Sequence, residues 1–200
     1  FIDPERLRFI ESLGKPVFPS PETIGLIQDK LIQKQTLKNN GLPVPEFVSV
    51  EENNTYASIA AILGSEFILK SRKMGYDGYG NHFVRNESEM LDGRKKLTRR
   101  HASVMAEKVI RFTKELAIMV AVNSHEVAVY PVVETIQENH ICKFVIAPAD
   151  VPVIIAEKAS KIASEAVRSV RGKGLFGVEL FLTANDEILV NEMAPRPHNS

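Results

Sequence analysis

The C-terminal part of the chain constrains the fold most, because it places two glutamates inside otherwise apolar segments. The residues on either side of a polar run at 183–187 are rich in Val, Ile, Leu and Phe, which predicts two strands joined by a hairpin turn. If the turn centres on Asn185 and Asp186, two residues lie opposite each other when their numbers add up to the same total as 185 and 186. Glu179 and Glu192 are then predicted to form such a pair.

Two opposed glutamates destabilise a hairpin, and apolar surroundings make it costly to ionise both carboxylates. A cation between them removes this conflict. Oxygen ligands suit a hard ion such as magnesium, which binds one or two carboxylates and fills its other positions with water and substrate phosphates. The alternative is a solvent-exposed edge hairpin, and a one-residue bulge would turn one glutamate to the other face. The spacing alone leaves both interpretations open.

Composition excludes several classes of protein. The chain has 200 residues, of which 44% are hydrophobic and 25% charged, as is typical of a soluble globular protein. Its 25 basic and 25 acidic residues cancel, so no overall field favours nucleic acid or an anionic membrane. No apolar run reaches the roughly 18 residues of a membrane-spanning helix. A single cysteine, Cys142, excludes an intramolecular disulfide framework and a multi-cysteine zinc site.

Local patterns predict an alternation of helices and strands. Apolar residues at helical spacing indicate helices at 2–13, 21–38, 56–63, 86–100 and 154–170. Apolar runs indicate strands at 47–50, 66–71, 82–85, 102–110, 114–122, 126–133 and 141–147, whereas 134–139 is predicted to be a polar turn. Within the second helix, Lys30, Lys34 and Lys38 recur every four residues, and we expect at least two of them on a solvent-exposed face.

The chain begins with Phe-Ile-Asp and ends directly after its densest polar cluster, so we expect it to be a piece of a longer protein. A proline-punctuated connector at 15–21 follows the first predicted helix. Residues before Pro21 are therefore expected to be the remnant of another domain.

A glycine-rich loop at 74–81 connects two predicted strands. It matches neither a Walker loop nor a dinucleotide fingerprint, because both of these open a helix. Glycine nevertheless lets backbone N–H groups approach phosphate oxygens, so the loop can fold over a nucleotide, with Lys70 supplying positive charge. The alternative is a mobile surface loop. Two further acids, Glu107 and Glu115, lie beside apolar runs and are expected at the rim of a site.

Several motifs together resemble the ATP-grasp superfamily and, within it, the carboxyaminoimidazole ribonucleotide synthetase family. The resemblance covers nearly the whole chain, and its most specific part is Ala194-Pro-Arg-Pro-His-Asn-Ser200. The segments that carry it are Lys70, Gly75–Asn81, Ala106–Ile110, Phe112–Leu116, Tyr130–Ile136, Ala147–Pro148, Gly177–Glu179 and Asn191–Ser200.

The resemblance implies an α+β fold, the ATP-grasp fold, in which two lobes with antiparallel sheets grip a nucleotide. The small lobe is expected at 64–103 and the larger, truncated lobe at 104–200. Residues 21–63 would supply connecting helices and a strand, and residues 1–20 would remain from an N-terminal domain.

The resemblance also implies roles residue by residue. It makes Glu179 and Glu192 magnesium ligands, in agreement with the hairpin argument. The second substrate is expected to contact Arg196, His198 and Asn199. The implied nucleotide contacts are Lys30; Lys70, on the phosphates; the loop residues Gly75, Tyr76, Asp77, Gly78, Tyr79, Gly80 and Asn81; the adenine hinge Glu107, Lys108, Val109 and Ile110; Glu115, on the ribose hydroxyls; Gln137; and Asn191.

The activity that the resemblance implies is the carboxylation of aminoimidazole ribonucleotide by bicarbonate and ATP, through carboxyphosphate, in purine biosynthesis. In fungi and plants this family forms the N-terminal part of phosphoribosylaminoimidazole carboxylase. We therefore expect ATP and magnesium as cofactors and aminoimidazole ribonucleotide and bicarbonate as substrates. The full-length protein is expected to be a homodimer in the cytoplasm, or in a plastid if it comes from a plant.

Two alternatives stay open. Formate-dependent glycinamide ribonucleotide transformylase shares the Pro-Arg-Pro-His motif, although it usually has Ser and Asp where this chain has Ala194 and Asn199. A non-catalytic ATP-binding module is a hypothesis of another class. It is motivated by Tyr79, where the family usually has an arginine, and by Gln137, where it usually has a histidine.

Overall fold

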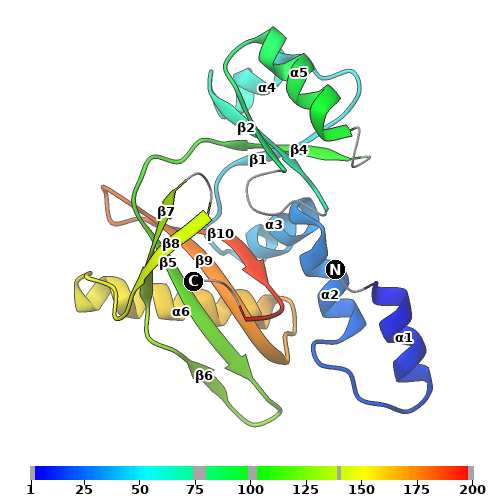
Figure 1. The fold of residues 1–200 in the computed structure, drawn as a ribbon, viewed down its shortest axis with the longest axis vertical. Coiled ribbons are helices and arrows are strands. Elements are labelled where there is room, and N and C mark those ends of the chain that lie inside the picture. Colours follow the sequence, from blue (N-terminus) through cyan, green and yellow to red (C-terminus); the bar gives the residue numbers. More distant parts are fainter. Residues whose placement is uncertain (1–2, 74–79, 99–102, 139–140, 198–200) are drawn as a thin grey trace.

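The computed structural model describes residues 3–73, 80–98, 103–138 and 141–197, which form two lobes (Figure 1). The helices are α1 (Pro4–Ser12), α2 (Pro21–Gln28), α3 (Lys30–Asn39), α4 (Tyr56–Leu63), α5 (Glu87–Thr98) and α6 (Val153–Ser169). The strands are β1 (Phe47–Val50), β2 (Phe67–Ser71), β3 (Asn81–Val84), β4 (Val104–Lys108), β5 (Phe112–Val122), β6 (Val127–Val129), β7 (Val133–Glu138), β8 (Ile141–Ile146), β9 (Gly174–Thr183) and β10 (Ile188–Ala194). None of the helices within these ranges is long and apolar enough to span a membrane.

The smaller lobe is built on a four-stranded antiparallel sheet with the strand order β1-β4-β2-β3. Helices α4 and α5 lie against this sheet (Figure 1), and Phe67, Leu69 and Met90 are fully buried in the core of the lobe. The sheet includes β1 and β4, so it extends on both sides beyond the predicted small lobe at 64–103. The sequence did not reveal this because Val50 pairs with Val104, a residue far along the chain.

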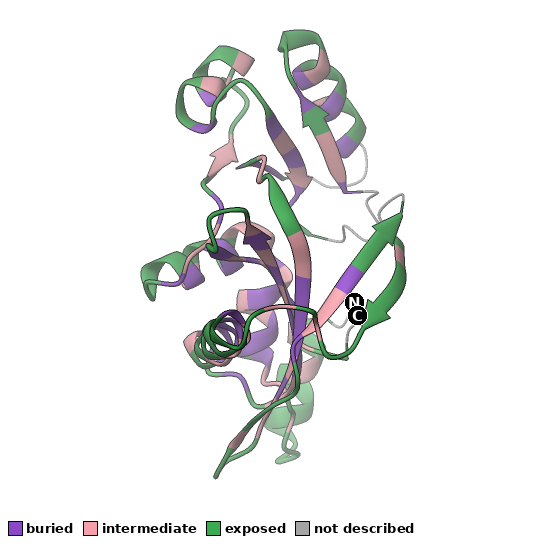
Figure 2. Cartoon of the chain, turned by 90° about the vertical axis from the view of Figure 1, so that its left-hand side faces the viewer, coloured by how far each residue is buried: buried purple, intermediate pink, exposed green. Residues whose placement is uncertain are grey.

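The larger lobe is built on a six-stranded antiparallel sheet with the order β10-β9-β5-β7-β8, and β6 pairs with one end of β5. Helix α6 covers one face (Figure 1), and Leu116 and Ile118 of β5 share a buried cluster with Ala163 and Val167 of the helix. Figure 2 shows buried residues gathered where helices meet the sheets. Because side chains alternate along a strand, Glu115 lies on the face opposite α6.

The segment predicted as a polar turn at 134–139 instead supplies most of strand β7, so this prediction is wrong. Its polar residues indicated a turn, but its backbone is paired on both sides. Thr135 lies opposite Glu115 of β5 and opposite Val145 of β8. Pairing with two neighbouring strands overrides the weak strand propensity of the segment.

The single helix predicted at 21–38 is broken into α2 and α3 at Asp29. The Asp29 carboxylate caps α3 by accepting a hydrogen bond from the backbone N–H of Leu31 at 3.0 Å. It also forms an ion pair with Arg72 of the small lobe at 2.7 Å, and the backbone N–H of Lys30 donates to the Arg72 carbonyl at 2.8 Å. The break therefore docks the start of α3 onto the small lobe.

The hairpin of β9 and β10 brings Glu179 opposite Glu192, as predicted. The turn differs from the prediction because it spans 184–186, three residues rather than two, and Asp186 adopts a left-handed φ of 58°. The longer turn shifts the register by one residue, and a bulge at Asn191 shifts it back. The predicted pair therefore exists because of the bulge.

The conformation of Asp186 gives a first prediction. Asp186→Val should lower the free energy of unfolding by about 1–2 kcal/mol, because a β-branched residue is strained at positive φ. Asp186→Gly should leave the stability unchanged or raise it slightly. Denaturant unfolding measures both changes. Asn185→Val is the control, because φ of Asn185 is not positive, and an equal loss for both valine variants would contradict the three-residue turn.

Candidate functional site

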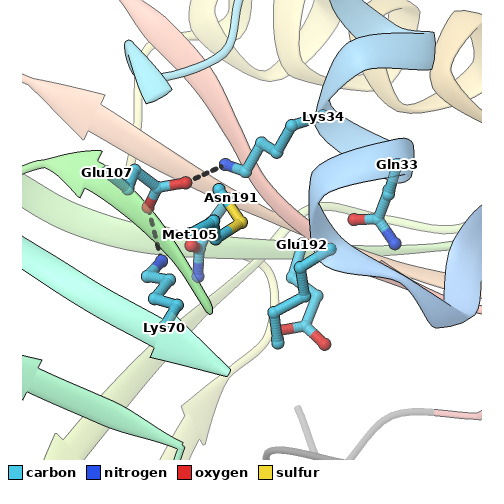
Figure 3. A pocket seen from close by; sticks show the side chains of 8 residues that line it. Gln33, Lys34, Lys70, Met105, Glu107, Asn191 and Glu192 are labelled. Atoms are coloured by element: carbon cyan, nitrogen blue, oxygen red, sulfur yellow. Dashed lines mark hydrogen bonds and ion pairs between the residues drawn. The ribbon is translucent and has the colours of Figure 1, made fainter. Parts of the chain in front are cut away.

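A pocket between the lobes gathers side chains from four separated segments of the chain (Figure 3). Helix α3 supplies three of them, β2 and β4 of the small lobe supply three, and β10 of the large lobe supplies two. Five of them were predicted from the sequence as site residues, and three, Gln33, Lys34 and Met105, were not. The lining residues are Lys30, Gln33, Lys34, Lys70, Met105, Glu107, Asn191 and Glu192.

Glu107 is the centre of a buried charge cluster (Figure 3). Its side chain is only 2% exposed, so its predicted position at the rim of the site is wrong. The carboxylate pairs with the ammonium groups of Lys34, at 2.8 Å, and of Lys70. Burial raises the pKa of the carboxyl. The attraction of the two lysine ammonium groups outweighs this effect and lowers the pKa to about 2. Glu107 is therefore ionised at neutral pH.

Lys34 reaches from α3 to both lobes. Its ammonium pairs with Glu107 of the small lobe and donates a hydrogen bond to the carbonyl of Val190 in β10 at 3.0 Å. Burial lowers the pKa of Lys34 to about 8, an effect that the charge of Glu107 only partly offsets. Lys34 is therefore a buried cation with a partner in each lobe.

The prediction that at least two lysines of the stripe are solvent-exposed is wrong. Lys34 is 3% exposed and the side chain of Lys30 is 19% exposed, whereas Lys38 lies on the surface. The stripe faces the junction of the two lobes because Asp29 turns α3 relative to α2. Periodicity identified the stripe but could not show what covers it.

Gln33 holds β10 from the same helix. Its amide nitrogen donates to the carbonyl of Met193 at 2.9 Å, and its amide oxygen accepts from the N–H of Met193 at 3.0 Å. Strand β10 lies at the edge of the sheet, so these bonds take the place of a neighbouring strand. Val190 and Met193 flank the bulge, and α3 therefore fixes both of its ends.

The bulge brings together the polar residues of the large lobe. Lys30 forms an ion pair with Glu192, and the side-chain amide of Asn191 donates to Glu179 at 3.2 Å. The described parts of the chain contain no group of three or more His, Cys, Asp or Glu side chains arranged for a metal. A metal held by Glu179 and Glu192 would thus need water or a bound substrate for its other ligands.

Glu115 lies on the same face of the large sheet as Glu179. It is two residues from Ala117, which is the ladder partner of Glu179. Burial, and to a lesser degree the charge of Glu179, raises the pKa of Glu115 to about 7. Carboxylates thus crowd this face, and a bound cation or a hydrogen-bond donor would relieve their repulsion.

The predicted adenine hinge joins the two lobes. Glu107 is paired within the small sheet, with β1 on one side and β2 on the other, and β4 ends at Lys108. The N–H of Lys108 donates to the carbonyl of Glu46 at 2.8 Å. Val109 and Ile110 lead from β4 into β5 and are half-buried.

Other predicted residues lie away from the pocket or outside the part of the chain that the structure describes. Gln137 is exposed on β7 at a bulge, and the exposed Arg196 donates to the carbonyl of Pro197 at 2.7 Å. Gly80 accepts a hydrogen bond from the N–H of Ser71 at 2.8 Å, and Asn81 begins β3. The residues outside the described ranges are Gly75, Tyr76, Asp77, Gly78, Tyr79, His198 and Asn199. Their roles stay predictions.

The raised pKa of Glu115 gives a second prediction. The fold favours its protonated form, so this contribution to stability is present below pH 4.5 and is lost as the pH rises through 7. Glu115→Gln should therefore raise the free energy of unfolding at pH 8 by about 1 kcal/mol, a value discounted because the side chain is only half-buried. Thermal unfolding at pH 8 and pH 4.5 measures it. The exposed Glu138→Gln is the control, and equal gains at both pH values would refute the assignment.

Residues 35–200 match the model of the ATP-grasp domain. The chain is 47% identical over 192 residues to phosphoribosylaminoimidazole carboxylase from Ogataea methanolica, and this alignment covers 95% of the chain but 35% of that protein. Relatives of this kind are thus about three times as long as the chain.

Two solved structures from Aspergillus clavatus are similar over the whole chain. Carboxyaminoimidazole ribonucleotide synthase complexed with ATP has a TM-score of 0.91 and 40% identity, covering 99% of this chain and 52% of that chain. N5-carboxyaminoimidazole synthase in complex with ADP and 5-aminoimidazole ribonucleotide has a TM-score of 0.89 and 38% identity, covering 100% of this chain and 52% of that chain.

Proposed function

Since the chain belongs to the ATP-grasp family, we propose that it binds ATP between its lobes and serves in the ATP-dependent carboxylation of aminoimidazole ribonucleotide in purine biosynthesis. The observation that carries this proposal is the pocket, in which cationic side chains of α3 and β2 meet the polar residues of the β10 bulge. The names of the similar proteins, and their complexes with ATP or with ADP and 5-aminoimidazole ribonucleotide, support the same substrates.

The charges of the pocket suit a phosphate chain. Lys30 and Lys70 each pair with a carboxylate in the chain itself, Glu192 and Glu107 respectively. Phosphate oxygens can accept charge-assisted hydrogen bonds from the same ammonium groups. Binding would therefore exchange internal ion pairs for contacts with the nucleotide and would draw on both lobes at once.

Carboxylation follows from two displacements at this site. An oxygen of bicarbonate attacks the γ-phosphorus of ATP, the bond from that phosphorus to the bridging oxygen breaks, and ADP leaves. The exocyclic amine of aminoimidazole ribonucleotide then attacks the carboxyl carbon of carboxyphosphate. Phosphate leaves with the electrons of the broken C–O bond, and the amine loses a proton. Lys30 and Lys70 would orient the phosphoryl oxygens.

Glu179 and Glu192 fit magnesium, because they face each other in the hairpin and supply only oxygen donors. Magnesium bound there would neutralise the charge that develops on the phosphates. Bicarbonate as co-substrate, a homodimeric full-length protein and a cytoplasmic location are further parts of this proposal, and they rest on the sequence resemblance.

The third prediction tests the magnesium site. Glu192→Gln keeps the size of the side chain but removes its charge, so it should weaken binding of magnesium–ATP by roughly tenfold or more and binding of metal-free ATP far less. Calorimetry with and without magnesium measures both affinities. The exposed Glu187→Gln is the control. An equal loss of affinity in both titrations, or no loss, would contradict the assignment of Glu192 as a magnesium ligand.

The activity itself is tested on the full-length protein by ADP release. We expect release with aminoimidazole ribonucleotide and bicarbonate together, and little with either one alone. Release with glycinamide ribonucleotide and formate would instead identify the transformylase activity. ATP binding without turnover on either pair of substrates would identify a non-catalytic binding module.

A further inference from the structure

The role of Lys34 is the feature that the proposed function leaves unexplained. A buried ammonium is costly, and a buried ion pair often stabilises a protein no more than apolar residues of the same volume would. Lys34 is nevertheless 3% exposed and has partners in both lobes. It lines the pocket, but it is not among the nucleotide contacts that the sequence resemblance implies. Its position therefore calls for a function other than packing.

On the small-lobe side, Lys34 shares Glu107 with Lys70. The two oxygens of the carboxylate are divided between them, Oε2 with Lys34 and Oε1 with Lys70. The three groups together carry one net positive charge. Without Lys34, the buried carboxylate would have Lys70 as its cationic partner and would hold it more strongly. Lys34 thus sets how readily Lys70 can turn to a phosphate.

On the large-lobe side, Lys34 and Gln33 hold the two ends of the bulge. Lys34 donates to the carbonyl of Val190, and Gln33 bonds to both backbone groups of Met193. The bulge is what places Glu192 opposite Glu179. A shift of β10 by one residue would undo this pairing.

We propose that Lys34, assisted by Gln33, is a positioning residue that holds the phosphate-binding lysine of the small lobe and the bulge of the large lobe in one fixed arrangement. This inference rests on the proposed binding of ATP. A site shared by two lobes works only if both lobes are held in the right relative position. A single side chain that contacts both halves can place the lysine for the phosphates and the carboxylates for the cation at the same time.

The test compares Lys34→Met with Lys38→Met in the full-length protein. The second variant makes the same substitution one turn further along α3, where the lysine is exposed. Calorimetry gives the affinity for magnesium–ATP and for metal-free ATP, at a temperature where unfolding curves show each variant folded. We expect Lys38→Met to stay within about twofold of the wild type and Lys34→Met to lose roughly tenfold or more in both titrations.

Gln33→Met separates the two halves of the inference, because Gln33 contacts the bulge but not Glu107. It should weaken binding of magnesium–ATP and leave binding of metal-free ATP within about twofold. Lys34→Arg, which keeps the charge and the donors, should recover part of the affinity that Lys34→Met loses. A role in folding alone would produce neither pattern.

The outcomes separate this inference from the function on which it rests. If the wild type binds no ATP, the proposed function falls and the inference falls with it. If the wild type binds ATP and folded Lys34→Met binds equally well, the inference alone is overturned. If Lys34→Met does not fold, Gln33→Met decides, and unchanged affinity for magnesium–ATP in that variant overturns the inference.

Discussion

The buried ion pair between Lys34 and Glu107 is the interaction on which the arrangement of the lobes depends. Charges at a few per cent exposure must be paired, because an isolated buried charge would cost several kcal/mol. Lys34 of helix α3 has a partner on each side: it pairs with Glu107 in the small lobe and donates a hydrogen bond to the Val190 carbonyl of β10 in the large lobe. The start of the same helix is tied to the small lobe by Asp29 and Arg72.

The irregular features of the large lobe follow from this arrangement. Strand β10 lies at a sheet edge, where Lys34 donates to the Val190 carbonyl and Gln33 bonds to both backbone groups of Met193. Side-chain bonds from a helix tolerate a bulge that a further strand would not readily accommodate. The bulge in turn aligns Glu179 with Glu192 and lets Asn191 reach Glu179.

The site contains neighbouring carboxylates on one side and lysines on the other. This distribution of charge is suited to an anionic ligand that binds together with a cation. Burial, and to a lesser degree the charge of Glu179, raises the pKa of Glu115 on one face of the large sheet. Lysines from α3 and the small lobe line the pocket together with Glu107 and Glu192. A phosphate chain would meet the lysines, and its counter-ion would meet the carboxylates.

The sequence by itself determined most helix and strand positions through local periodicity, and its contiguous motifs implied the antiparallel lobes through the family resemblance. It also predicted the opposed pair Glu179 and Glu192, but this pairing depends on a bulge at Asn191 that the prediction did not include. It did not determine that Lys34 is buried, that the helix breaks at Asp29, or that β1 joins β4. Each of these depends on partners from distant parts of the chain. Only the tertiary structure decides whether a stripe of lysines meets water or carboxylates, since the free energy of a charge is set by what surrounds it.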